Sequence, residues 1–217
     1  MGSLGTDGAG ASRPAPIVFV VDDDVSVREA LDSLIRLDNW QVETFGSAHD
    51  FLCRPRVVAP SCLVLDVALP DLNGLDVQKR IADRTDMPII FITGYGDIPI
   101  TVQAMKAGAV EFLTKPIDND ALLSAIRLAI DRSEAALREE AELQALRESY
   151  ATLSRREREV MALVAAGLLN KQVGGELGIS EITVKAHRGR VMEKMKAKSL
   201  AALVNMNAKL GLRSGTV

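Results

Sequence analysis

Residues 17–31 read IVFVVDDDVSVREAL, in which five apolar residues run directly into three aspartates and then into a helical pattern. A short apolar run of this kind is typical of a fully buried strand. Asp22, Asp23 and Asp24 follow it at once, and neighbouring carboxylates repel one another and are costly to remove from water unless a cation compensates them. The cluster is therefore either a solvated turn or a site.

The sequence beyond this stretch repeats the alternation of strand and helix. Apolar, β-branched runs predict further strands at 42–45, 62–65, 89–92 and 112–113, and helical patterns lie at 25–37, 48–52, 75–82, 98–107 and from 119 onward. Five short strands alternating with helices favour an α/β fold with a doubly wound parallel sheet that is covered on both faces. In such a sheet the ligand crevice lies at the carboxyl ends of the strands.

Polar residues follow four of the five predicted strands and would meet at that edge. Asp22 and Asp23 follow the first strand, Asp66 the third, Thr93 the fourth and Lys115 the fifth. Carboxylate oxygens are the ligands that hard cations such as Mg²⁺ take, and a carboxylate can also act as a nucleophile that becomes an aspartyl phosphate. The pattern predicts a site for a divalent cation and a phosphoryl group.

Four ordered motifs, VVDDD, LVLDVALPDLNGL, FITGYGD and EFLTKP, resemble the receiver domain of two-component response regulators over about residues 16–130. The resemblance implies a flavodoxin-like fold with Asp66 as the phosphoacceptor. It also implies Mg²⁺ as the cofactor, held by Asp22, Asp23 and Asp66 together with the backbone carbonyl of Ala68.

The same resemblance assigns the residues that would respond to phosphorylation. Thr93 is expected to bind the phosphoryl group, Lys115 to pair with it, and Phe112 to be the aromatic residue of the switch; the Lys115–Pro116 bond is expected to be cis. Two neighbouring residues stay undecided. Asp24 is either part of the site or a cap of the following helix, and Tyr95 is either an interaction residue or an ordinary exposed aromatic.

A different class of protein also fits the opening aspartates. The DxDx start of haloacid-dehalogenase-type phosphatases would make Asp22 the phosphorylated residue and the chain an enzyme. That alternative requires a further acidic pair at the end of a later strand, and it gives the C-terminal half of the chain no function. We therefore expect a protein that is no enzyme, beyond assisting its own phosphorylation and dephosphorylation at Asp66.

Charge divides the chain into an acidic and a basic part. Residues 14–130 carry 10 basic and 17 acidic residues, a net charge of −7, whereas residues 153–217 carry 12 and 5, a net charge of +7. Such asymmetry suggests that only the C-terminal part contacts a polyanion. We expect a disordered tail over 1–15, a receiver over 16–130, a linker helix over 131–152 and a DNA-binding domain over 153–217.

Composition narrows the location and excludes other frameworks. No apolar run approaches the roughly 18 residues of a membrane span, and the N-terminal residues lack the pattern of a signal peptide. The two cysteines, Cys53 and Cys62, have no metal-ligand spacing. We expect a cytoplasmic protein with no membrane partner and without a disulfide framework or structural zinc.

The last helix of the receiver continues into the linker without Gly or Pro. We interpret the linker as a charged helix, and a coiled coil is the alternative.

Beyond the linker, Ser154 is expected to cap one helix, Asn170 the next and Ser180 a third that runs to about Lys196, with Gly178 in the turn between the last two. Two helices around such a turn indicate an all-α helix-turn-helix domain, which a fourth helix from Leu200 completes.

The third of these helices has one face for the domain core and one for DNA. At about 100° per residue, Val184, His187, Val191 and Met195 share the core arc. Three residues lie opposite and would face the major groove: Lys185, Ala186 and Gly189. The residues expected to contact phosphates are Lys171, Thr183, Arg188, Arg190 and Lys194.

The segments LSRREREV, NKQV, LGIS, TVKAHR and KMKAKS resemble the LuxR-type DNA-binding domain over about residues 150–213. With the receiver, the chain resembles response regulators of the NarL/FixJ class, and the motifs TGYGD and MKAGAVEFLTKP are FixJ-like. The resemblance implies a sensor histidine kinase and promoter DNA as partners. It also implies that phosphorylation produces a homodimer, through a face that includes Met105 and Val110. The dimer would contact RNA polymerase and activate transcription. A regulator of the same fold that works without phosphate is the remaining alternative.

Overall fold

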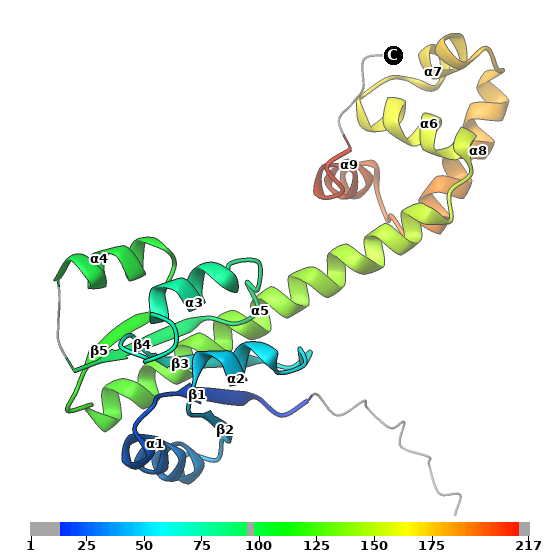
Figure 1. The fold of residues 1–217 in the computed structure, drawn as a ribbon. Helices are drawn as coiled ribbons and strands as arrows, with labels where there is room; N and C mark the ends of the chain where they lie inside the picture. The colour runs from blue at the N-terminus through cyan, green and yellow to red at the C-terminus, as the bar shows by residue number, and fades with distance from the viewer. Residues whose placement is uncertain (1–13, 95–97, 213–217) are drawn as a thin grey trace, which may run out of the picture. The chain divides into compact units, whose positions relative to one another are not determined.

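The computed structural model of the chain describes residues 14–94 and 98–212 (Figure 1). The chain divides into two compact units, Met1–Arg138 and Glu139–Val217, so the division falls inside the predicted linker. Residues 1–13 of the predicted tail, and Tyr95, lie outside the described residues.

The first unit is built on a five-stranded sheet. Its strands are β1 (Ile17–Val21), β2 (Gln41–Phe45), β3 (Ser61–Asp66), β4 (Ile89–Thr93) and β5 (Glu111–Thr114). All neighbouring strands are parallel, in the order β2-β1-β3-β4-β5. The predicted doubly wound fold is confirmed, and each predicted strand is present to within one residue at either end.

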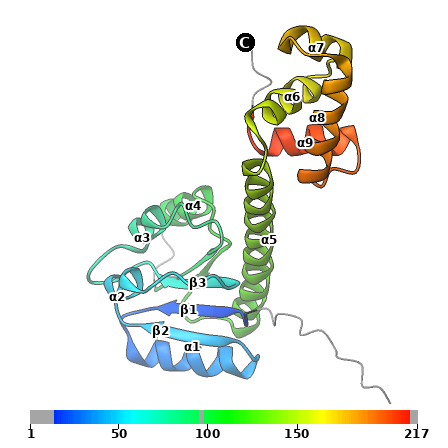
Figure 2. The ribbon, with the colours of Figure 1, turned by 90° about the vertical axis from the view of Figure 1, so that its right-hand side faces the viewer.

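Helices cover both faces of this sheet (Figure 2). The helices of this unit are α1 (Val25–Leu37), α2 (Ala48–Cys53), α3 (Gly74–Arg80), α4 (Ile98–Lys106) and the first part of α5 (Asn119–Ala151). Alternate residues of β1 pack into two cores: Phe19 faces α2, α3 and α4, whereas Val20 faces α1 and α5. Because β1, β3 and β4 are buried on both faces, their sequences read as continuous apolar runs rather than as alternating ones.

The helix α5 extends for 33 residues, and its buried residues lie between Leu122 and Ser133. Ser133 anchors it to the amino ends of the strands: its hydroxyl accepts from the N–H of Ser61 at 2.9 Å and donates to the carbonyl oxygen of Asp86. The predicted continuation of the last receiver helix into the linker is therefore present as one helix.

The second unit packs four further helices, α6 (Arg155–Ala165), α7 (Asn170–Leu177), α8 (Glu181–Lys194) and α9 (Leu200–Lys209), around one core. Ser154 and Glu157 form the predicted capping box, and Ser180 caps α8. Gly178 has a left-handed backbone (φ 65°), which ends α7. The prediction that Asn170 caps α7 is wrong, because the helix begins at that residue.

The side chain of Asn170 is used elsewhere in this unit. Its amide oxygen accepts from the Arg188 guanidinium at 3.2 Å, while the N–H of Leu169 donates to the side chain of Gln172.

Among the residues that the structure describes, no helix is both long enough and apolar enough to cross a membrane.

Candidate functional site

The register of the sheet brings two distant aspartates together. In the parallel pairing of β1 with β3, Val21 lies opposite Leu65. The residues that come next, Asp22 and Asp66, are therefore neighbours at the carboxyl edge of the sheet, and both are buried. The sequence predicted this meeting from the common end of the strands, and the register is its physical cause.

Lys115 connects these two carboxylates. It follows β5, and its ammonium group donates to Asp22 Oδ2 at 2.7 Å and to Asp66 Oδ2 at 2.6 Å. The other oxygens of both aspartates accept from the backbone: Asp24 N–H donates to Asp22 Oδ1, and Ala68 N–H donates to Asp66 Oδ1, each at 2.9 Å. Both carboxylates are thus held by one cation and one backbone amide.

Burial and pairing shift the ionisation of this group in identifiable directions. Burial raises the pKa of the Asp22 carboxyl, against the opposing effect of the hydrogen bond from Lys115. For Lys115, burial alone would lower the pKa of the ammonium, but the hydrogen bonds to Asp22 and Asp66 outweigh it and the pKa is raised. Lys115 is therefore charged at neutral pH and supplies the positive charge that both aspartates contact.

A third carboxylate completes an acidic group that fits a divalent cation. One carboxylate oxygen each from Asp22, Asp23 and Asp66 lie within 4.8 Å of one another. Asp23 is exposed, and its carboxylate has no hydrogen-bond partner among the described residues. Three carboxylates against the one ammonium of Lys115 leave an excess of negative charge, and their oxygens are the donors that Mg²⁺ prefers.

Asp24 has a local structural role. It is the N-cap residue of α1, and its carboxylate accepts from the N–H of Ser26 at 2.8 Å. The same contact lowers the pKa of the Asp24 carboxyl. Of the three aspartates that follow β1, two belong to the acidic group and the third caps a helix.

The predicted switch residues border the same edge. Thr93 ends β4 and is buried, and its carbonyl accepts from the N–H of Lys115 at 2.7 Å. Phe112 is partly buried on β5, with its ring 6.2 Å from that of Phe91. The Lys115–Pro116 bond is cis, as predicted. The part assigned to the Ala68 carbonyl stays a prediction, because only the N–H of that residue has a contact at the site.

Gly74 supports the site and was not recognised as functional from the sequence. A Cβ atom at this position would lie 2.7 Å from the carbonyl oxygen of Asp66 and 3.2 Å from the ring of Phe91. Only glycine allows the start of α3 to approach the end of β3 so closely. The signal was present in the segment DLNGL, where Asn73 caps α3 and glycine follows it.

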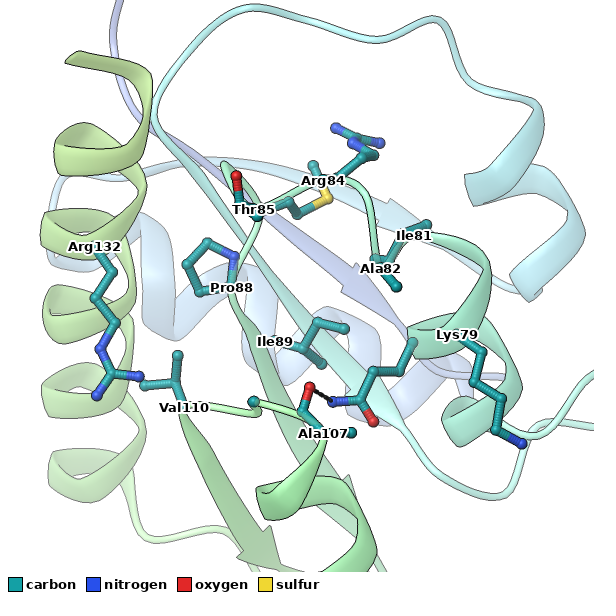
Figure 3. A pocket seen from close by; sticks show the side chains of 13 residues that line it. Lys79, Ile81, Ala82, Arg84, Thr85, Pro88, Ile89, Ala107, Val110 and Arg132 are labelled. Atoms are coloured by element: carbon teal, nitrogen blue, oxygen red, sulfur yellow. Dashed lines mark hydrogen bonds between the residues drawn. The ribbon is translucent and has the colours of Figure 1, made fainter. Parts of the chain in front are cut away.

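A separate cavity of about 400 Å³ lies at the opposite edge of the sheet (Figure 3). Its walls include apolar Ile81, Ile89 and Val110 and the cationic side chains Lys79, Arg84 and Arg132. None of the residues lining it is Asp, Glu, His or Cys. This cavity therefore offers no carboxylate ligands for a hard cation, and it is distinct from the acidic group.

The face of α8 that was predicted to meet DNA is exposed in the second unit. Lys185, Ala186, Gly189 and Arg190 are all exposed, and the opposite arc is the core, with Val184, Val191 and Met195 buried. His187 is half-buried at the edge of that arc. The helical wheel thus predicted the buried arc and the exposed arc correctly, and the contact of the exposed arc with DNA stays a prediction.

The residues that were predicted to contact phosphates differ in whether their side chains already have partners within the domain. Lys171 is exposed, whereas the hydroxyl of Thr183 contacts that of Ser180 at 2.8 Å. Arg188 is half-buried and donates to Asn170. A cation already bound within the domain must give up that partner, or share it, to bind a phosphate.

Lys194 is the strongest case of such an internal contact. Its ammonium donates to Glu157 Oε2 at 2.7 Å and to the carbonyl of Thr152 at 3.2 Å. The hydrogen bond from Lys194 lowers the pKa of the buried Glu157 carboxyl to about 2. This lysine joins the end of α8 to the start of α6, a structural role that the sequence did not indicate.

Comparison with known proteins defines the class. Residues 18–127 match the family model of the response regulator receiver domain, and residues 151–207 match that of the bacterial regulatory proteins of the luxR family. The chain therefore belongs to the two-component response regulators that join a receiver to a LuxR-type DNA-binding domain. That class implies a kinase partner and promoter DNA, and it sets aside the phosphatase alternative.

Individual relatives agree with this class over almost the whole chain. Nodulation protein W of Bradyrhizobium diazoefficiens is 51% identical over 197 residues, which cover 90% of this chain and 87% of that protein. The transcriptional regulatory protein FixJ of the same organism is 40% identical, with 90% and 96% covered. Among solved structures, the response regulator StyR is similar with a TM-score of 0.79, 45% identity, and 90% of this chain and 100% of that chain covered.

Proposed function

We propose that a sensor histidine kinase phosphorylates Asp66, and that the phosphorylated protein dimerises and binds promoter DNA to activate transcription. The observation that carries this proposal is the contact of Asp66 with Lys115 at 2.6 Å, inside a group that also contains Asp22 and Asp23. Such a buried, charge-compensated carboxylate at the end of a central strand is suited to accept a phosphoryl group.

The chain's own residues account for the transfer by positioning and charge. A carboxylate oxygen of Asp66 attacks the phosphorus atom; the new O–P bond forms while the N–P bond to the kinase histidine breaks, and the electron pair returns to the imidazole nitrogen. The Ala68 N–H holds one oxygen of Asp66 in place. Lys115, already beside the other oxygen, neutralises charge on the phosphoryl group.

Mg²⁺ is the cofactor that the acidic group fits. Asp22, Asp23 and Asp66, together with the carbonyl of Ala68, would hold it. When bound, the cation supplies positive charge that offsets the negative charge of the phosphoryl oxygens. Without a cation, the carboxylates that Lys115 leaves uncompensated repel an incoming phosphoryl group.

Two residues would transmit the modification. Thr93 lies one strand away from Asp66, and its hydroxyl would move toward the phosphoryl group. Phe112, which is only partly buried, would then turn inward. Such a coupled pair makes a two-state element of α4 and β5.

The proposed dimer surface is the outer face of α4. Three apolar side chains are exposed there: Ile98, Val102 and Met105. Val110, which the sequence placed on the same surface, is only 6% exposed and packs between the sheet and α5, so it is not available to a partner. We expect Val102→Asp to abolish the phosphorylation-induced dimer in sedimentation velocity, while Leu37→Asp, on the surface of α1, leaves it intact.

The DNA interface is proposed on α8 and the start of α7. Lys185, Ala186 and Gly189 would face the bases, and Lys171, Thr183, Arg188 and Arg190 would contact phosphates. Dimerisation increases the affinity because two linked half-site contacts bind far more tightly than one. Contact of the bound dimer with RNA polymerase, and action in the cytoplasm where promoter DNA lies, complete the proposal.

The decisive comparison uses an Asp66→Asn variant. Fluorescence anisotropy with a DNA site selected from random sequence should give tight binding only for wild-type protein treated with acetyl phosphate and Mg²⁺. The variant should bind weakly whether treated or not. Equal binding by treated wild type and by the variant would contradict the proposal and support regulation without phosphate.

A further inference from the structure

Ile182 is an apolar side chain in an unexpected place. It is the second residue of α8 and is 80% exposed. Among the described residues of the second unit, no other large apolar side chain is as exposed. A β-branched residue gives no helical advantage at such a position and loses the free energy of burial there.

Its direction on the helix is fixed by the core on the other side. At about 100° per residue, Ile182 lies opposite Val191, which is buried. Ala186 and Gly189 fall within an arc of about 60° that includes Ile182. Over the N-terminal part of α8, the centre of the exposed face is therefore formed by one large apolar side chain followed by two small residues, and Glu193 continues the same arc near the end of the helix.

The small residues allow a surface to approach the helix closely. Ala186 projects only a methyl group, and a Cβ atom built at Gly189 would have no heavy atom within 4 Å. Lys185, a long cation on this face, is paired with Glu181 at 3.2 Å, an exposed contact that is easily exchanged. A partner that meets this face thus meets Ile182 first.

Duplex DNA offers one apolar group that matches this face. In the major groove the bases present hydrogen-bonding atoms, except for the C5-methyl group of thymine. The N-terminal residues of a recognition helix are those that contact base edges. The charge of the unit favours DNA as the occupant, since residues 153–217 carry a net charge of +7.

We propose that Ile182 packs against the methyl group of a thymine and thereby sets a preference for thymine at one position of each half-site. This inference rests on the proposed function, in which α8 enters the major groove, and it adds the chemistry of base selection. Lys185 would read a neighbouring base through hydrogen bonds, whereas Ile182 reads through apolar contact alone.

Removing the methyl group from the DNA tests this contact directly. In a DNA site selected from random sequence by the protein treated with acetyl phosphate and Mg²⁺, each thymine is replaced in turn by uracil, which lacks only that methyl. At one thymine per half-site, the replacement should weaken wild-type binding by about fourfold, as expected from exposing one buried methyl group. With Ile182→Ala the same replacement should leave the affinity unchanged.

Two further variants control the measurement. Ile182→Val keeps a branched side chain and should retain most of the sensitivity to uracil. Leu37→Ala removes an apolar side chain of equal exposure from α1 and should retain all of it. Because Ile182 is on the surface, circular dichroism of Ile182→Ala should match that of the wild type.

The possible failures are distinct. If the wild type binds its site but no thymine is sensitive to uracil, or if Ile182→Ala keeps the full sensitivity, the assignment of Ile182 is overturned while the proposed function stands. If the phosphorylated wild type selects no DNA sequence at all, the proposed function fails, and this inference fails with it.

Discussion

The ammonium group of Lys115 lies 2.6 Å from Asp66 and 2.7 Å from Asp22, although these residues come from three different strand ends. It is therefore the counter-charge of the buried carboxylates. Replacing it with a neutral side chain leaves their repulsion uncompensated, which makes the acidic group a stronger site for a cation and a weaker one for a phosphoryl group.

We expect Lys115→Met to raise the affinity for Mg²⁺ by about fivefold or more, because removing one positive charge at contact distance is worth at least about 1 kcal/mol. Isothermal titration calorimetry measures this directly. The matched control is Lys79→Met, which removes a lysine paired with Asp76 on the surface of α3 and should leave the affinity unaltered. An unchanged or lower affinity for Lys115→Met would refute the role of Lys115 as counter-charge.

Replacing Gly74 should disturb the same site sterically. Alanine at this position would bring a Cβ atom to 2.7 Å from the Asp66 carbonyl oxygen, so the end of β3 or the start of α3 must move. We expect Gly74→Ala to slow the phosphorylation of Asp66 by acetyl phosphate by about tenfold or more, since small displacements of a nucleophile are costly. Gly175→Ala, in the second unit, is the control and should react at the wild-type rate. A wild-type rate for Gly74→Ala would disprove the requirement for glycine.

Two adjacent glycines of α7 should respond in opposite ways to the same substitution. A Cβ atom at Gly174 would lie 2.7 Å from the Ile179 carbonyl oxygen, whereas at Gly175 nothing lies within 4 Å. We expect Gly174→Ala to lower the free energy of unfolding of the second unit by about 1–3 kcal/mol through overpacking. Gly175→Ala should raise it by about 0.5–1 kcal/mol. Urea denaturation followed by circular dichroism measures both, and a shared sign would contradict this account.

The ion pair of Glu157 with Lys194 predicts a dependence of stability on pH. The pKa of Glu157 is about 2 in the folded protein, below its ordinary value of 4.5. The pair therefore stabilises the fold above about pH 4.5, and this contribution is lost as the pH falls through that value toward 2. Glu157→Gln should reduce protection of the α6 and α8 amides from hydrogen exchange at pH 7, by about 2 kcal/mol.

That difference between Glu157→Gln and the wild type should shrink as the pH is lowered from 5 to 3. The control is Glu142→Gln, which removes an exposed carboxylate 3.4 Å from Lys209 and should change stability by less than about 0.5 kcal/mol. A difference for Glu157→Gln that is the same at pH 7 and pH 3 would exclude the pair as its source.

The sheet and the acidic group could be predicted because both follow from local patterns. A strand buried on both faces is apolar along most of its length, so β1, β3 and β4 are marked by their composition. Parallel strands end at one edge, so Asp22 and Asp66 were expected to meet there. The contact of Lys115 with both aspartates depends on how far its side chain extends past the end of β4, and the sequence pattern of the strands does not determine this.

Contacts between distant segments were the part that sequence could not predict. Lys194 was assigned to phosphates from its place on a helical wheel, but its partner Glu157 is 37 residues away. Gly174 is required because the carbonyl oxygen of Ile179 would lie 2.7 Å from a Cβ atom there, a contact that the sequence does not reveal. Val110 was placed on a surface that packing against α5 covers. Ile182 was not predicted to face DNA, although its position three residues before Lys185 places it on the same side of α8.

The central claim is that Asp66 is the residue phosphorylated. Incubation with acetyl phosphate and Mg²⁺, followed by reduction of the acyl phosphate with borohydride and peptide mapping by mass spectrometry, locates the modified aspartate. We predict modification of the peptide that contains Asp66, and none in the Asp66→Asn variant. Modification at Asp22 with Asp66 untouched would contradict the account.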